Sequence, residues 1–304
     1  MKILAIIVTY NGMKWIDHCL RSLRDSYIPI QTMVIDNGST DGTRDFVPAN
    51  YPDAIWMPQD ENLGFGQANN IGLRYALDNN ADYALLLNQD AWINQEMLVQ
   101  LLRYDDKKSI LSPIHLNGKG DDFDSNFRHN TISHSSDINS LRELKRGDKL
   151  RPFQANAVAA ACWLIPAEII KKVGGFNPLF FQYGEDHNYL DRVFYHGFGL
   201  KVVPTTFACH DRYQHGNRQL YQHRVVYRYL LLKATDINIE PKGKDYLKIC
   251  GFWCRKGLKV HKPFKFIGQS ISGLWRLFRN RKKIRESRIA EQNIGTTWLE
   301  HIDD

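Results

Sequence analysis

Residues 83–92, with the sequence YALLLNQDAW, restrict the fold of this chain more than any other segment. The run from Tyr83 is apolar or aromatic and ends at Asn88 and a single acid, Asp90. Such a run predicts a strand buried on both faces, as in a parallel sheet. A carboxylate at the carboxyl end of that strand lies where open α/β sheets bind ligands. The alternative is a solvated Asp in a strand-to-helix turn, so the neighbouring segments must decide.

The N-terminal third of the chain repeats this strand pattern. Residues 3–10 are a second apolar run, residues 15–23 have helical spacing, and residues 32–36 predict another short strand. The turn at residues 37–42 is rich in Asn, Asp, Ser and Gly, and its polar side chains can cap a following helix. A strand, a helix and a strand in this order predict a right-handed βαβ unit.

Later segments continue the alternation. Residues 155–165 predict a strand, Pro166 the first residue of a helix that ends before Gly174, and residues 184–192 the start of another helix. Residues 200–204 predict a last strand, with His210 beyond it. The chain is therefore expected to be one large α/β domain with an appendage.

Composition excludes several classes of protein. The five cysteines (Cys19, Cys162, Cys209, Cys250 and Cys254) lack the spacing of a zinc site, so we expect reduced, cytosolic thiols. No run of 18 apolar residues occurs, and we expect neither a signal peptide nor a transmembrane helix. The net charge of +7 is uneven, because residues 240–304 hold 15 Lys or Arg against 7 Asp or Glu. Residues 1–239 hold 25 against 26.

Two other segments suggest ligands without establishing them. The glycines of residues 62–72 do not have the spacing of a phosphate-binding Walker loop, and the turn after the first strand lacks a dinucleotide fingerprint. Residues 117–149 form a long polar segment, for which we favour a mobile loop near a second substrate. The histidines in and beside it, His115, His129 and His134, do not have the spacing of a metal site.

Five motifs in order carry a resemblance to family 2 glycosyltransferases, and more narrowly to their rhamnosyltransferase-like bacterial members. They are VTYNG at residues 8–12, VIDNGSTDG at 34–42, NLGFGQANN at 62–70, LNQD at 87–90 and GGFNPLFFQYGED at 174–186. The resemblance covers about residues 2–215. It implies a GT-A-type, Rossmann-like α/β fold, whose mixed, mostly parallel sheet is flanked by helices. We expect this domain over residues 1–239 and a small helical extension over residues 240–304.

The resemblance also implies roles for individual residues. Asp90 is the expected metal-binding acid, His210 matches a position that can complete the metal shell, and Mg²⁺ or Mn²⁺ suits these ligands. Glu185 and Asp186 match the family's acidic pair, in which the Asp is the usual base of inverting members. The nucleotide is expected to contact Thr9, Tyr10, Asn11, Asp36, Asn62, Gly64, Asn69, Asn88 and Arg192. For Arg192 the alternatives are steadying the diphosphate or pairing with a helix carboxylate.

The implied activity is inverting transfer of a sugar from a dTDP- or UDP-sugar. The acceptor would be a saccharide or lipid-linked saccharide in bacterial cell-surface polysaccharide synthesis. Two positions depart from the family pattern, since Asn88 and Asn188 replace acids. They motivate an alternative, a non-catalytic nucleotide-sugar-binding scaffold. A nucleotidyltransferase would be expected to carry a Gly-rich, Lys-containing loop after its first strand, and residues 8–12 are not one.

The basic C-terminal segment has two open interpretations. Apolar residues between Phe264 and Phe278 alternate with basic ones, which is typical of an amphipathic helix on an anionic membrane surface. A core-packing helix with a solvated basic end explains the pattern equally well. Only charge would favour nucleic acid, which we do not expect as a partner. We therefore expect a cytoplasmic protein that could attach peripherally to the inner face of the cell membrane. The oligomeric state is left open.

Overall fold

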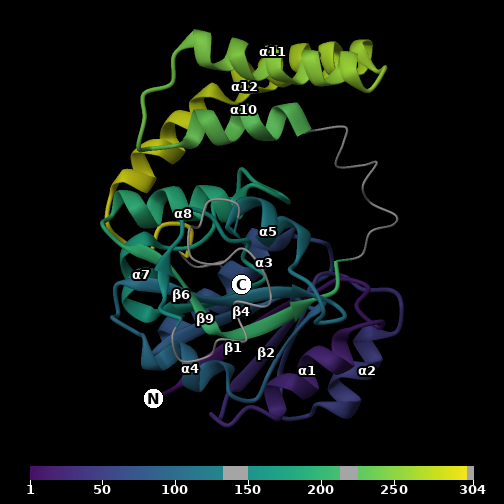
Figure 1. The fold of residues 1–304 in the computed structure, drawn as a ribbon, viewed down its shortest axis with the longest axis vertical. Coiled ribbons are helices and arrows are strands. Elements are labelled where there is room, and N and C mark those ends of the chain that lie inside the picture. The colour runs from purple at the N-terminus through teal and green to yellow at the C-terminus, as the bar shows by residue number, and fades with distance from the viewer. Residues whose placement is uncertain (133–149, 213–224, 300–304) are drawn as a thin grey trace.

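A computed structural model describes residues 1–132, 150–212 and 225–299 of the chain. These residues form one mixed nine-stranded sheet in the order β3-β2-β1-β4-β8-β6-β9-β5, with β7 paired to β9 (Figure 1). The strands are β1 (Ile3–Thr9), β2 (Gln31–Asp36), β3 (Ile55–Pro58), β4 (Tyr83–Leu87), β5 (Ala91–Ile93), β6 (Ser109–Asn117), β7 (Phe153–Gln154), β8 (Cys162–Pro166) and β9 (Gly199–His210). Strands β1 to β4 are mutually parallel where they pair, whereas β8 runs antiparallel to β4 and begins the mixed half.

Helices cover both faces of this sheet, as the doubly buried strands require. In β1, Leu4 and Ile6 point into one core while Ala5 and Ile7 point into the other. The first core is closed by α3 (Phe65–Asp78), α5 (Ser125–Asn130), α7 (Ala167–Val173) and α8 (Glu185–Tyr195). The second is closed by α1 (Ile16–Arg24), α2 (Thr43–Asn50) and α4 (Met97–Arg103). The expected α/β class and the flanking helices are confirmed.

Several boundaries differ from those expected. The predicted strand over residues 155–165 is confined to β8, and Pro166 is its last residue and the N-cap of α7. Strand β9 continues to His210, which therefore ends the strand instead of following it. Strand β6 was not predicted, because Ser112, Pro113 and His115 dilute its apolar pattern and a bulge interrupts it. The polar segment contains α5, and its residues 133–149, with His134, lie outside the described residues.

Three helices form a further layer beside α8, namely α10 (Val225–Thr235), α11 (Gly243–Lys259) and α12 (Pro263–Gln292) (Figure 1). Leu230 and Trp253 belong to the apolar core between them, so α10 belongs to this layer although it precedes residue 240. After α12 the chain returns to the sheet domain, where Thr297 O accepts from Gly175 N at 2.8 Å. Leu299, 1% exposed, packs into the main core. No helix among the described residues is long and apolar enough to span a membrane.

Candidate active site

Asp90 and His210 meet at the carboxyl end of β4. The short strand β5 pairs antiparallel with the end of β9, which places Ala91 opposite His210. Asp90 Oδ1 then lies 3.3 Å from His210 Nε2, although 120 residues separate them in sequence. The Asp90 side chain is 19% exposed, so a ligand in solvent can reach it. The tertiary structure thus brings the two expected metal ligands together.

The chemistry of this pair fits a divalent cation that shares its remaining ligands with a substrate. No group of three or more metal-ligating side chains occurs in the described ranges 1–132, 150–212 and 225–299. A carboxylate oxygen and an imidazole nitrogen suit Mn²⁺, and Mg²⁺ is commonly held by one or two carboxylates plus substrate phosphates. Asn88 Nδ2 lies 3.4 Å from the same His210 nitrogen, so Asn88 borders the pair.

Asp124, the N-cap residue of α5, lies next to the His210 ring. It caps the N-terminus of α5 by accepting from Asn126 N and Phe127 N, and it accepts from Arg212 Nε at 2.5 Å. Its Oδ2 lies 3.7 Å from His210 Nδ1. Burial would raise the pKa of Asp124, but the charges of Arg212 and His210 lower it below the ordinary value. Asp124 is therefore ionised and places a negative charge beside the His210 ring.

His115 lies next to this group but is not placed as a ligand. Burial and the charge of His210 lower the pKa of His115 to about 3, so its imidazole is neutral. Its Nε2 lies 3.1 Å from Ser112 Oγ, and its ring stacks on Phe127.

Gln89, the residue before Asp90, contacts two of the expected nucleotide residues at the end of β1. Its Oε1 accepts from Thr9 Oγ1 at 2.6 Å and from Tyr10 N at 2.9 Å. Thr9 is fully buried, so its hydroxyl serves this contact, while Tyr10 is 45% exposed and offers an aromatic face. Asn11 has a left-handed φ of 50°, and its Oδ1 accepts from Thr40 N. Hydrogen bonds thus connect the carboxyl ends of β1 and β2, which together form one rim of the site.

Asp36 lies at the bottom of this rim, at the end of β2. Its side chain is fully buried and accepts from Arg44 Nε at 2.8 Å and from Ser39 N at 3.1 Å. Arg44 is 41% exposed and covers the carboxylate. A nucleotide base that uses Asp36 must therefore bind beside Arg44 or displace it.

Gly64 joins the nucleotide side to the loop before α8. It has a φ of +80°, and a Cβ built there would lie 2.0 Å from the carbonyl oxygen of Phe181. Asn62 Oδ1 accepts from Gly64 N and shapes the turn, whereas Asn69 is buried and donates to Phe65 O within α3. The close approach at Gly64 explains why a glycine stands there.

Glu185 and Asp186 begin α8 with different protonation states. Burial and the charge of Asp186 raise the pKa of Glu185 to about 8, and the buried Glu185 Oε2 has no hydrogen-bond partner in the described structure. Burial would also raise the pKa of Asp186, but the hydrogen bond and charge of His187 lower it below the ordinary value. Asp186 Oδ1 lies 3.0 Å from His187 Nδ1. At neutral pH Glu185 is therefore protonated and Asp186 ionised.

Tyr183, two residues before Glu185, is affected by the charges of both the acidic pair and Asp90. The pKa of Tyr183 is raised by burial, and both Glu185 and Asp90 add to the increase. The charge of Arg212, two residues after His210, lowers the pKa of Asp186 as well as that of Asp124. Tyr183 has a left-handed φ of 65°, which is uncommon for an aromatic residue.

Arg192 does not face the nucleotide, which corrects that expectation. Its side chain is fully buried and donates to the carbonyl oxygens of Val173 and Gly175. Its Nε lies 3.7 Å from Oε1 of Glu291 in α12, so it pairs with a helix carboxylate. Asn188 is also fully buried and interacts with Glu291. One of the two departures from the family pattern therefore lies outside the site.

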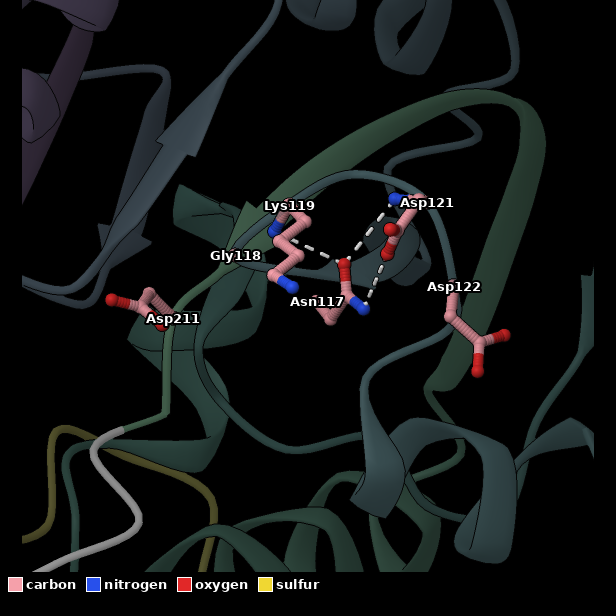
Figure 2. Close-up of a pocket in the computed structure, with 6 residues that line it drawn as sticks. All are labelled: Asn117, Gly118, Lys119, Asp121, Asp122 and Asp211. Atoms are coloured by element: carbon pink, nitrogen blue, oxygen red, sulfur yellow. Dashed lines mark hydrogen bonds between the residues drawn. The ribbon is translucent and has the colours of Figure 1, made fainter.

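A polar hollow lies between the turn that follows β6 and the residue after β9 (Figure 2). Its lining residues are Asn117, Gly118, Lys119, Asp121, Asp122 and Asp211. Asp211 joins the hollow to the site, because its backbone N donates to Asp90 O. Its carboxylate accepts from Trp15 Nε1 at 2.8 Å. The lining holds three carboxylates and the Lys119 amine, and Asp122 and Asp211 pair with Arg128 and Lys14.

A family model described as glycosyl transferase family 2 matches residues 4–174, which is more than half of the chain. The chain belongs to glycosyl transferase family 2. It is accordingly a glycosyltransferase, and the family resemblance seen in the sequence is confirmed.

Curated relatives of this family 2 enzyme include sugar transferases from several organisms. The hexosyltransferase Agl10 of low-salt glycan biosynthesis in Haloferax volcanii is 27% identical over 82% of the chain and 83% of its own length. The N-acetylglucosaminyl-diphospho-decaprenol L-rhamnosyltransferase of Mycobacterium tuberculosis is 22% identical over 88% of the chain and 93% of its own length. The dTDP-rhamnosyl transferase RfbF of Shigella flexneri is 24% identical over 68% of each chain.

Solved structures share the fold of the family. S. aureus TarS in complex with UDP-GlcNAc has a TM-score of 0.57 and 17% identity, covering 96% of this chain and 89% of that one. The mannosyltransferase PcManGT of Pyrobaculum calidifontis, with GDP-Man and Mn²⁺, has a TM-score of 0.58 and 15% identity, covering 98% and 84%. These similarities confirm the GT-A fold.

Three residues that our sequence interpretation did not assign shape the site. Gln89 lies inside the NQD triplet but has no charge to draw attention to it. Arg44 covers Asp36 from the following helix, and Asp124 supports His210 from within the polar segment. Only for Asp124 did the sequence carry a signal, since an Asp before a short polar helix is a typical N-cap.

Proposed function

We propose that this family 2 enzyme transfers a sugar with inversion from a dTDP- or UDP-sugar to a saccharide or lipid-linked saccharide. The product would belong to bacterial cell-surface polysaccharide, formed at the cytoplasmic face of the membrane. The observation that carries the proposal is the pairing of Asp90 with His210. The relatives support the donor and acceptor classes, since one is a dTDP-rhamnosyl transferase and another an N-acetylglucosaminyl-diphospho-decaprenol L-rhamnosyltransferase.

The residues act as follows in this proposal. The acceptor hydroxyl oxygen attacks the anomeric carbon, its proton passes to the Asp186 carboxylate, and the bond to the nucleoside diphosphate breaks with its electron pair on the diphosphate. Asp186 suits a base because it is ionised at neutral pH, whereas protonated Glu185 cannot accept a proton. A divalent cation, Mg²⁺ or Mn²⁺, held by Asp90 and His210 would supply Lewis-acid neutralisation of the leaving diphosphate.

The donor is expected to lie on the rim formed by the ends of β1 and β2. Tyr10 would stack on the base, and Asp36 would accept from the ring N–H of uracil or thymine beside Arg44. Asn11, Asn62, Gly64 and Asn88 would line the same side of the site, whereas buried Thr9 and Asn69 would support it without contacting the nucleotide. The polar hollow around Asp211, whose backbone contacts that of Asp90, would receive the hydroxyl-rich saccharide.

The first test is a thermal-shift comparison of UDP, dTDP, GDP and CDP, each with Mn²⁺, Mg²⁺ or EDTA. A ligand that binds only the native state raises the melting temperature by mass action. We expect UDP or dTDP to stabilise the protein only with a metal, and Asp90→Ala to abolish the effect. The control Asp53→Ala removes an exposed carboxylate away from the site and should change nothing. No response to any pyrimidine diphosphate would contradict the donor assignment.

The base assignment needs a kinetic test. Asp186→Asn should keep the nucleotide-dependent thermal shift but lower transfer, or the slow hydrolysis of the donor, by about 10²- to 10⁴-fold. The scaffold alternative predicts binding without any turnover in the wild-type protein. Unchanged turnover in Asp186→Asn would refute the base role.

A further inference from the structure

We infer that α11 and α12 carry a surface that docks on an anionic lipid membrane. The inference is independent of the donor and acceptor proposed above, because it depends only on the surface of the helical layer. That layer lies on the side of α8 away from the sheet (Figure 1).

The first observation is an apolar stripe along α12. It consists of Phe264, Ile267, Ile271, Trp275 and Phe278, which are spaced three or four residues apart and therefore lie on one face of the helix. Their exposed fractions run from 43% for Ile267 to 86% for Phe264. The buried residues of α12, such as Gly273 and Ile284, lie on a different face, which packs against the rest of the layer. The stripe thus remains exposed after the layer has formed its own core.

The neighbouring helix also exposes large apolar side chains. Leu247, Phe252 and Leu258 of α11 are each more than half exposed. A monomer rarely exposes so many large apolar side chains on two adjacent helices unless they contact another apolar phase.

The second observation is the charge around the stripe. Residues 241–285 contain fourteen Lys or Arg and one acid, Asp245. Arg279 lies over the exposed ring of Trp275 at 4.7 Å, and Arg281 over that of Phe278 at 4.2 Å. Basic side chains around an exposed apolar stripe match an anionic bilayer, in which lipid phosphates and acyl chains lie side by side. Protein interfaces usually combine charges of both signs, whereas residues 241–285 are almost uniformly basic, which favours the membrane over a protein partner.

The third observation links this surface to the active site. Helix α10 belongs to the same layer, and its Arg228 lies 5.6 Å from the ring of Tyr183. Its charge also lowers the pKa of Glu185, against the dominant effect of burial. The proposed membrane surface and the turn before α8 are therefore parts of one packed assembly of helices.

The test uses the full-length protein and sedimentation with vesicles of phosphatidylcholine, with and without phosphatidylglycerol. We expect binding to the anionic vesicles, weaker binding as salt rises, and little binding to neutral vesicles. Trp275→Ala/Phe278→Ala and Arg279→Glu/Lys283→Glu should each lower the partition coefficient by roughly tenfold or more. The matched controls are Tyr27→Ala, an exposed aromatic residue of the sheet domain, and Arg103→Glu/Lys108→Glu, an exposed basic pair there. Both should bind like the wild type.

Three results would overturn the inference. One is absence of wild-type binding to anionic vesicles at physiological salt. Another is equal binding by the stripe variant and the wild type. The third is a stripe variant that still binds vesicles but has an altered oligomeric state in light scattering or has lost binding to DNA. The stripe would then contact another copy of the protein, or DNA, instead of a membrane. The vesicle test contains no sugar nucleotide, so its failure leaves the proposed transfer reaction untouched.

Discussion

At the scale of single residues, the adjacent acids Glu185 and Asp186 show how position decides chemistry. The Glu185 side chain is turned into the core beside Phe176 and Gly66, where burial favours its neutral form. The next side chain contacts His187 and keeps its charge. Two neighbouring carboxyl groups therefore differ in protonation at neutral pH, which leaves one proton acceptor at the start of α8.

This difference predicts a pH dependence of stability. Because the pKa of Glu185 is raised to about 8, the folded protein holds a proton that the unfolded chain releases above about pH 4.3. The contribution of Glu185 to stability is therefore complete at low pH and is lost as pH rises towards 8. Glu185→Gln should remove this part of the decline, as seen in urea unfolding between pH 5 and pH 8. Parallel pH profiles for the two proteins would show that Glu185 is already ionised.

At the scale of elements, the contact between α3 and the loop before α8 joins two parts of the proposed site. Gly64, the N-cap of α3, lies against the backbone of Phe181, four residues before Glu185. Only a glycine at position 64 allows this close approach, because a Cβ there would overlap the Phe181 carbonyl oxygen. Gly64, in the proposed nucleotide pocket, and the acidic pair Glu185 and Asp186 are therefore linked through backbone packing.

A matched pair of glycine variants tests this link. Gly64→Ala should displace the loop and weaken both nucleotide binding and turnover. Gly197→Ala is the control, because Gly197 has a similar φ of +78° but nothing within 4 Å of an added Cβ. It should cost about 1–2 kcal/mol of stability from the backbone conformation and leave turnover unchanged. Equal kinetic effects in the two variants would mean that backbone strain, and not the Phe181 contact, is responsible.

At the scale of the whole molecule, the C-terminal segment stabilises the sheet domain. Glu291 in α12 is the carboxylate that pairs with fully buried Arg192, and it also accepts from Asn177 Nδ2 at 2.7 Å. Leu299 fills part of the core between α3 and α7. The proposed boundary at residue 240 therefore separates segments that share a core.

A chain ending at residue 239 is accordingly predicted to lose cooperative unfolding, as measured by circular dichroism on heating. It would leave the buried Arg192 charge unpaired and open the core at Leu299. In the full chain, Glu291→Gln isolates the electrostatic part and should cost about 3–5 kcal/mol. A truncated chain that melts like the full-length protein would show that residues 1–239 fold independently.

The sequence by itself determined the α/β class, the family and the order along the chain of the strands that lead to Asp36 and Asp90. Those features depend on local periodicity and on short motifs, which a single segment contains. The pairing of Asp90 with His210 required β5 and β9 to meet. Likewise, only packing against α12 decided that Arg192 binds Glu291 instead of a diphosphate. The protonation states of Glu185 and Asp186 also depended on tertiary structure. Burial and long-range charge arise from neighbours distant in sequence, and no local pattern encodes them.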